Sequence, residues 1–151
     1  MVLPRTFKKD SVINKLDFNF HLLLETELPK NSFTFNDEDY DVPCVFQIWE
    51  KRDVKRNKII QKTKTTYFEF SSKKDADFAM RRVGGLAGKV IEDFEDYKEP
   101  SHYYIKTPTN KKKIIKTLKD SYKEFNEKAK NTAGNPSLSK HELITIFEKN
   151  I

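Results

Sequence analysis

The segment Arg81–Lys89 reads Arg-Arg-Val-Gly-Gly-Leu-Ala-Gly-Lys and sets three glycines between basic residues. Glycine lets a backbone approach a phosphate closely, and Arg and Lys supply the opposite charge. The segment is not a Walker loop, because its glycines are too closely spaced and Val90 stands where Ser or Thr would bind magnesium. We predict a turn between two strands, at which Arg81, Arg82 and Lys89 contact a nucleic-acid backbone. A solvated turn without a ligand is the alternative.

A second basic segment runs from Lys51 to Lys64. It holds a single acid, Asp53, and seven basic residues: Lys51, Arg52, Lys55, Arg56, Lys58, Lys62 and Lys64. Such a run can track phosphates, each contact adding a salt-dependent gain in affinity. It can equally be a solvated, mobile loop, and the sequence leaves both interpretations open, with the loop slightly preferred.

The sequence gives little indication of a catalytic site or a metal site. His21, His102 and His141 are far apart in sequence, and none has a partner at metal-ligand spacing. Asp41 and Asp53-Val-Lys55 loosely resemble the acids of a magnesium-dependent nuclease. A strand predicted between them would separate them by about 30 Å at roughly 3.3 Å per residue, too far to share an ion. We predict no catalytic and no metal-ligating residue.

The composition favours an ordered chain with an anionic partner. The 151 residues include 12 Phe, 6 Tyr and 1 Trp, and 29 basic against 23 acidic residues give a net charge of +6. Cys44 is the single cysteine and lies in an apolar run, so we expect a buried thiol and no disulfide. No apolar run approaches the roughly 20 residues that span a bilayer. We expect a cytoplasmic protein of a bacterial or virus-infected cell, without membrane contact.

The first part of the chain resembles the closing strands of an α/β sheet. We predict a strand end within 1–7, a short helix from Asp10 or Ser11 to Leu16, and a buried strand at Phe20–Glu25. The acidic stretch Leu28–Asp41 is predicted to be a loop. Val42–Glu50 gives the strongest strand signal, with Pro43 at its beginning because proline cannot donate to a central ladder.

After Lys64 the pattern changes to a small antiparallel sheet followed by helices. The predicted strands lie within Thr66–Phe70, Asp77–Val83, Gly88–Ile91 and His102–Thr107. One long helix follows Thr109 and ends at Gly134, with an apolar residue at every third or fourth position. The Ser139–Glu142 capping box opens a last helix. We therefore expect two domains, 1–64 and 65–151.

Four segments, in this order, are similar to stretches of phage, viral and bacterial adenine-specific nucleic-acid methyltransferases that depend on S-adenosylmethionine. They are Val2–Leu16 with its Pro-Arg-Thr-Phe, Asp41–Glu50, Arg81–Gly84 with Ala87–Lys89, and Ser101–Lys106. The likeness covers about residues 1–106, and Gly134–Leu143 extends it weakly. It implies an α/β or α+β fold, in which the closing strands of a class I methyltransferase-like sheet precede a small antiparallel sheet and two C-terminal helices.

The resemblance also implies what these residues do not contain. In that family an Asn-Pro-Pro-Phe motif orients the amino group of a flipped adenine, and a glycine-containing turn holds the methyl donor. The only Asn-Pro here is Asn135-Pro136, and the chain opens with no strand–glycine turn–helix unit. We therefore expect no catalytic or cofactor-binding residue in this chain. S-adenosylmethionine would bind only if a partner, such as an N-terminal methyltransferase subunit, completes the sheet.

We expect a fragment or subunit of such an enzyme that binds nucleic acid, DNA in preference to RNA. The half sheet would otherwise expose an edge and uncovered faces, so a homodimer is a further possibility. The alternative is a non-catalytic phage or plasmid protein that uses the same scaffold for binding or regulation. The predicted nucleic-acid-binding residues are Arg5, Lys51, Arg52, Arg56, Arg81, Arg82, Lys89 and His102.

Overall fold

The computed structural model describes all 151 residues. Small antiparallel sheets combine with short helices, which agrees with the α+β alternative of the prediction. The chain divides into two compact units, Met1–Ile60 and Gln61–Ile151, close to the predicted border at Lys64. Each unit is described by itself below.

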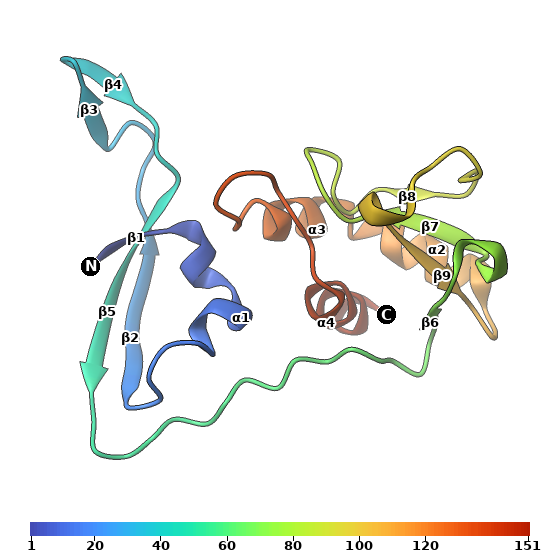
Figure 1. Ribbon diagram of the computed structural model, residues 1–151, viewed down its shortest axis with the longest axis horizontal. Coiled ribbons are helices and arrows are strands. Elements are labelled where there is room, and N and C mark those ends of the chain that lie inside the picture. The colour runs from blue at the N-terminus through green and yellow to red at the C-terminus, as the bar shows by residue number, and fades with distance from the viewer. The chain divides into compact units, whose positions relative to one another are not determined.

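The first unit is built on a three-stranded sheet with the order β1-β5-β2. β1 (Val2–Pro4) and β2 (Phe20–Glu27) each pair antiparallel with β5 (Cys44–Lys51), so β1 and β2 run parallel to each other (Figure 1). The connection between them contains the 3-10 turn η1 (Arg5–Lys8) and the short helix α1 (Asp10–Ile13). The unit therefore contains a strand–helix–strand crossover, with a later strand inserted between its two strands.

One face of this sheet is covered and the other is open. Gln47 on β5 is buried, and its amide donates to the Phe7 carbonyl in η1 at 3.3 Å, which places η1 over that face. The register pairs Val2 with Phe46 and Leu24 with Ile48 on the opposite face. We name Val2, Leu24, Phe46 and Ile48 the open face; three of them, all but the half-buried Phe46, are between 41% and 51% exposed.

The prediction of a buried strand at Phe20–Glu25 is therefore wrong in its burial. β2 is an edge strand and is exposed at seven of its eight positions. Its run of leucines reads like the centre of a sheet, because the sequence does not reveal where a sheet ends. In the whole first unit only two apolar side chains, Cys44 and Val45, are buried.

The acidic stretch predicted as a loop contains a small hairpin, β3 (Phe33–Phe35) and β4 (Glu38–Tyr40). Asn36 and Asp37 form its turn with φ of 51° and 60°. A two-residue turn with both φ values positive matches the twist of paired strands, and Asn and Asp tolerate that region best after glycine. The strands are too short to give a clear alternating pattern in the sequence.

The basic segment after β5 forms no helix or strand from Arg52 to Thr65, yet it is held in place along its length. The Asn14 side chain bonds both the amide and the carbonyl of Ile59, at 2.9 and 2.8 Å. The Arg56 amide donates to Phe18 at 2.8 Å. The segment is thus a strap along the first unit, with more anchors than a fully solvated loop would have.

The second unit contains a four-stranded antiparallel sheet with the order β6-β9-β7-β8. It confirms the small antiparallel sheet predicted from the sequence, with shorter strands. Their bounds are β6 (Glu69–Phe70), β7 (Phe78–Arg81), β8 (Val90–Ile91) and β9 (His102–Lys106). The short turns η2 (Lys73–Asp75) and η3 (Glu99–Ser101) interrupt the connections.

Three helices follow: α2 (Lys111–Asp120), α3 (Tyr122–Ala129) and α4 (Lys140–Asn150). The predicted single helix is thus divided at Ser121, and it ends before Gly134. The Ser139–Glu142 capping box is confirmed, because the Glu142 amide donates to Ser139 Oγ at 3.2 Å and the Ser139 amide donates to Glu142 Oε2 at 2.8 Å.

The strands and helices of this unit share one hydrophobic core. Phe78, Met80 and Ile105 from the sheet are fully buried together with residues of all three helices: Ile114, Leu118, Phe125, Leu143, Ile144 and Phe147. Each large apolar side chain so buried stabilises the fold by about 1.5–3 kcal/mol. This core fixes which side of each helix faces solvent.

Gly88, at the end of the β7–β8 connection, lies directly against α3. Its φ is +98°, and a Cβ there would lie 2.5 Å from Phe125 Cβ. Gly134 has a similar φ of +89° but open space around it, and Gly85 has neither constraint. Substitutions at these three glycines can therefore distinguish the cost of a left-handed backbone from the cost of steric overlap.

We predict that Gly134→Ala costs about 1–2 kcal/mol of the free energy of unfolding through its left-handed backbone. Gly88→Ala should lose about 1–3 kcal/mol more, because it also overpacks the core. Gly85→Ala should stay within about 0.5 kcal/mol of the wild type. Urea unfolding of the three variants measures this, and equal losses for Gly88→Ala and Gly134→Ala would contradict the close approach.

Asp77, just before β7, ties the start of that strand to the end of β9. Thr107 donates to Asp77 Oδ2 from its amide at 2.7 Å and from its hydroxyl at 2.8 Å. These hydrogen bonds hold the pKa of the Asp77 carboxyl below its usual value. The ionised form therefore stabilises the fold above the unfolded-state pKa, and this contribution is lost as the pH falls through the folded-state pKa.

We predict that Asp77→Asn lowers the free energy of unfolding at pH 6, and that the difference from the wild type shrinks below about pH 4. Exposed Asp93, changed to Asn, is the matched control and should show no such pH-dependent difference. Urea unfolding between pH 2 and pH 6 measures both. A constant difference across that range would mean that the charge of Asp77 contributes nothing.

Candidate nucleic-acid interface

The glycine segment Arg82–Lys89 is the connection between β7 and β8, as predicted. Its backbone amides are largely occupied: Gly84 donates to Pro136 at 2.8 Å, Ala87 to Gly84 at 3.0 Å, and Gly88 to Arg81 at 2.8 Å. The Asn126 side chain also donates to the carbonyls of Gly85 and Ala87. Any contact with a phosphate must therefore come chiefly from side chains around the turn and not from a cradle of backbone amides.

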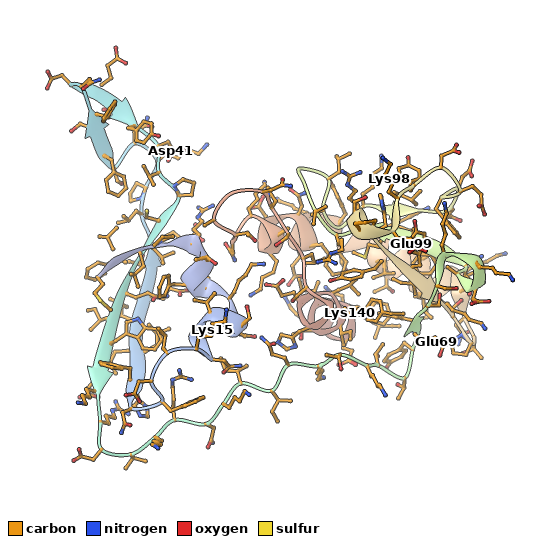
Figure 2. The ribbon with its side chains drawn as sticks, viewed as in Figure 1. Lys15, Asp41, Glu69, Lys98, Glu99 and Lys140 are labelled. Atoms are coloured by element: carbon orange, nitrogen blue, oxygen red, sulfur yellow. The ribbon has the colours of Figure 1, made fainter.

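The two arginines before the turn lie against the protein. Arg81 Nε donates to the Val83 carbonyl at 2.9 Å. The Arg82 guanidinium lies over the Tyr103 ring at 5.0 Å, and Arg82 Nε is buried with no hydrogen-bond partner. Lys140, labelled in Figure 2, lies over the Phe70 ring at 4.6 Å and the Tyr103 ring at 6.0 Å. Arg82 and Lys140 therefore both pack against the Tyr103 ring.

His102 lies inside the second unit. It is 4% exposed, its Nδ1 lies 2.9 Å from both Ser101 Oγ and the Lys98 carbonyl, and its ring contacts Tyr97 edge-on. Its Nε2 is buried without a partner. The prediction that His102 contacts nucleic acid therefore has no support in this arrangement, because the ring presents no polar atom to a ligand. It joins η3 to β9.

Lys89 is exposed and lines a shallow hollow of about 400 Å³. The other lining residues are Leu86, Val90, Lys119 and Tyr122. Lys119 comes from α2 and was missed by the sequence reasoning, which followed the apolar stripe of that helix and not the lysines beside it. The lysine spacing within α2 is the signal that would have found it.

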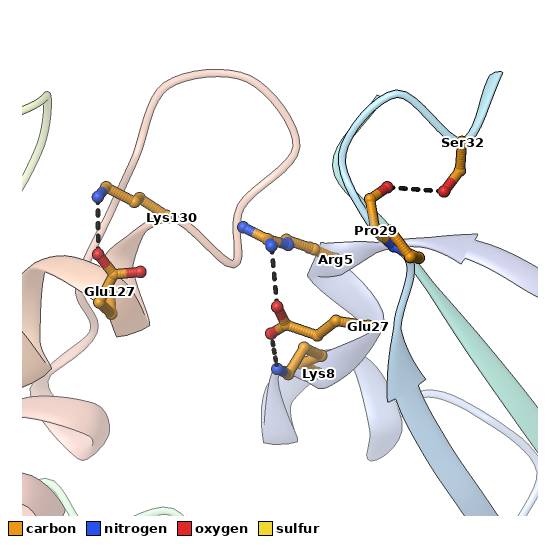
Figure 3. Close-up of polar contacts among 7 residues, drawn as sticks. All are labelled: Arg5, Lys8, Glu27, Pro29, Ser32, Glu127 and Lys130. Carbon is orange, nitrogen blue, oxygen red and sulfur yellow. Dashed lines mark hydrogen bonds and ion pairs between the residues drawn. The ribbon is translucent and has the colours of Figure 1, made fainter. Parts of the chain in front are cut away.

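In the first unit Arg5 is part of an ion-pair cluster. Arg5 Nη2 and Lys8 Nζ both donate to the Glu27 carboxylate, at 2.9 and 2.5 Å (Figure 3). The hydrogen bond from Lys8 is the main reason why the pKa of Glu27 lies below its usual value. Two cations on one carboxylate leave net positive charge at the end of β2, but Arg5 is only 27% exposed.

The predicted nucleic-acid-binding residues at the end of β5 and in the strap differ in exposure and in the contacts that they make within the protein. Lys51 is exposed, and exposed Arg52 pairs with Glu50. Arg56 is held by the first unit: its guanidinium donates to the carbonyls of Phe20, Ile13 and Leu16 at 2.9, 2.6 and 3.3 Å. Its guanidinium also lies over the Phe18 ring at 4.7 Å. Arg56 thus joins the strap to the α1–β2 connection.

The residues of the nuclease alternative lie beyond opposite ends of β5, with Asp41 before the strand and Asp53 after it. No group of three or more His, Cys, Asp or Glu side chains is placed to hold a metal ion. None of the helices has the length and apolar character to cross a membrane.

Comparison with known proteins adds no relative: no protein-family model, curated protein or solved structure matches the chain.

We predict that Arg56→Ala destabilises the first unit by about 1.5–3 kcal/mol, the typical loss for hydrogen bonds to a charged group. Arg52→Ala, which removes an exposed ion pair, should cost about 0–1 kcal/mol. Amide hydrogen exchange of β2 and β5 measures both. If Arg56→Ala leaves the amide hydrogen exchange of β2 and β5 unchanged but weakens DNA binding, Arg56 is a nucleic-acid-binding residue and not a structural one.

Proposed function

We propose that this chain forms the closing part of an S-adenosylmethionine-dependent, adenine-specific nucleic-acid methyltransferase. Its first unit would supply the last strands of the catalytic sheet, and its second unit would bind nucleic acid. No Asn-Pro-Pro-Phe motif occurs in these 151 residues, so in this proposal another polypeptide segment would carry that motif and the donor site. DNA is the preferred nucleic acid.

The strand order of the first unit carries this proposal. By its resemblance to the methyltransferases, the start of the chain corresponds to the end of the fifth strand of their sheet, and the segments Phe20–Glu25 and Val42–Glu50 correspond to its terminal hairpin. The proposal takes β1 as the end of that fifth strand and β2 with β5 as the hairpin, and it is supported by the strand order, in which β5 returns to pair with β1. The crossover through η1 and α1 makes β1 and β2 parallel, as in an α/β sheet.

The open face supports the need for further polypeptide. Parallel strands joined by crossovers occur almost only in sheets that are covered on both faces. Here one face carries η1, whereas Val2, Leu24 and Ile48 on the other are about half exposed. A sheet in which only Cys44 and Val45 are buried apolar residues gains little from hydrophobic burial. Covering the open face would supply the missing burial.

Nucleic-acid binding is supported by exposed cations in both units. In the first unit these are Lys51 and Arg52, and in the second they are Lys89 and Lys140. Arg82 adds a charge that is supported by an aromatic ring. Charge-assisted contacts to phosphate are short and strong, and every such contact releases counterions, so binding should weaken steeply with salt.

Calorimetric titration of the purified chain with S-adenosylmethionine, and separately with a short DNA duplex at two salt concentrations, tests the proposal. We expect no heat with the donor, because the proposal assigns the donor site to another polypeptide segment. We expect binding to the duplex that weakens by at least tenfold between 50 and 200 mM salt, as for a few phosphate contacts.

The outcomes separate the two parts of the proposal. Tight binding of S-adenosylmethionine would show that this chain itself contains a donor site, which contradicts the first part of the proposal. Absence of duplex binding even at low salt would remove the nucleic-acid role. Duplex binding without any methyl transfer, even with a second chain that carries the donor turn and the Asn-Pro-Pro-Phe motif, would favour a non-catalytic binding protein on this scaffold.

A further inference from the structure

Helix α2 presents a row of exposed lysines beside the stripe of its buried residues. Lys112, Lys116 and Lys119 are exposed, whereas the buried residues of this helix belong to the core of the second unit. Positions i, i+4 and i+7 lie on the same side of an α-helix, so the three amino groups form a row. At 1.5 Å per residue, this row extends about 10 Å along the helix axis.

The row continues onto the β7–β8 turn. Lys112, Lys116 and Lys119 border a shallow hollow of about 510 Å³, and Lys119 also borders the hollow of Lys89. Because Lys119 is common to both hollows, they form one continuous surface. We name Lys89, Lys112, Lys116 and Lys119 the α2 lysine surface.

Positive charge is dense on α2. The ten residues of α2 contain five lysines and one acid, Asp120, which gives a net charge of +4, against +6 for all 151 residues. A concentration of one sign of charge raises the local density of counterions and attracts polyanions. The second unit, 61–151, holds 19 basic and 13 acidic residues, so α2 supplies four of its six net positive charges and is where this unit would attract a polyanion. The segment Lys51–Lys64, with seven basic residues against Asp53, is the other basic segment of the chain.

The lysine placement does not serve the helix itself. The first turn of α2 contains no acid, and Asn110 at its N-cap makes no side-chain hydrogen bond to the helix. Positive charge near a helix N-terminus is unfavourable, because the aligned peptide dipoles already make that end positive. Lys112 and Lys113 therefore oppose the helix dipole, and a bound anion would relieve this repulsion.

We propose that the α2 lysine surface binds the phosphate backbone of a nucleic-acid strand, an inference that rests on the nucleic-acid binding proposed above. Successive phosphates of one strand advance by about 3.4 Å along a duplex axis, so the row matches about three of them. Exposed Leu86 and half-buried Tyr122 line the hollow that Lys89 and Lys119 share. Uncharged groups among the lysines suit the sugars and bases of a nucleic acid better than they suit a purely acidic peptide.

Two acids at the border of the surface restrain its lysines without burying them. Glu92 accepts from Lys119, and Asp120 accepts from Lys116. All four side chains are at least half exposed, so these pairs are weak and a phosphate can displace the carboxylates. Neutralising either acid should therefore strengthen binding, an effect that loss of folding cannot imitate.

The test is the binding of the full chain to a fluorescent 20-base-pair duplex, measured by anisotropy between 50 and 200 mM salt. The variant Lys112→Gln/Lys116→Gln/Lys119→Gln should bind about tenfold more weakly or worse, with a salt slope smaller by about three, since each lost phosphate contact removes about one unit. Glu92→Gln and Asp120→Asn should each bind more tightly than the wild type.

The matched control is Lys15→Gln/Lys30→Gln/Lys74→Gln, which removes the same charge from exposed lysines outside the surface. An equal loss in both triple variants would overturn the inference, because net charge alone would then explain binding. The inference would also be overturned if a polyglutamate of equal charge competed for binding as well as an unlabelled duplex does, because the surface would then not prefer nucleic acid. If the wild type does not bind DNA, the proposed function itself fails; if it binds and the α2 variant equals the wild type, only this inference fails.

Discussion

A β-sheet must bury at least one face to be stable, and the two units meet this requirement very differently. In the second unit, the sheet packs against α2, α3 and α4 around a core of 16 buried residues. In the first unit, η1 covers one face of the sheet, and the open face of Val2, Leu24, Phe46 and Ile48 is left to solvent. The proposed role of each unit follows from this difference: the first is suited to being completed by other polypeptide, and the second to presenting a surface.

Polar contacts hold the first unit where apolar contacts are few. Buried Gln47 donates to the Glu25 carboxylate at 2.6 Å and accepts from the Trp49 indole at 2.9 Å, so its amide joins two strands to η1. Arg56 fastens the strap through three carbonyls. A network of this kind specifies geometry well but adds little net free energy, because each hydrogen bond replaces one with water. Such a network suits the proposed role of the first unit, whose sheet would already have its shape before another polypeptide covers it.

The second unit shows how a core decides the placement of charge. The burial of Ile114, Ile115 and Leu118 turns α2 so that its lysines point to solvent, and the close packing of Gly88 on Phe125 brings the β7–β8 turn to the same side. Lys89 and Lys119 are far apart in sequence, yet they border one hollow. In the proposed interface the glycine segment would contribute through its position against α3, whereas its backbone amides bond within the protein.

The sequence by itself determined β5 with Pro43 before it, the turn at Arg82–Lys89 and the capping box of α4, because each depends on residues near one another in the chain. It left the choice between α/β and α+β open. It could not show that β2 is an exposed edge, that His102 is buried or that Arg56 is a structural tie. Those outcomes depend on which segments meet in space, and local pattern carries no information about such partners. The pairing of Lys89 with the α2 row was decided only by the tertiary structure, since a shared core had to orient both elements before their charges could form one surface.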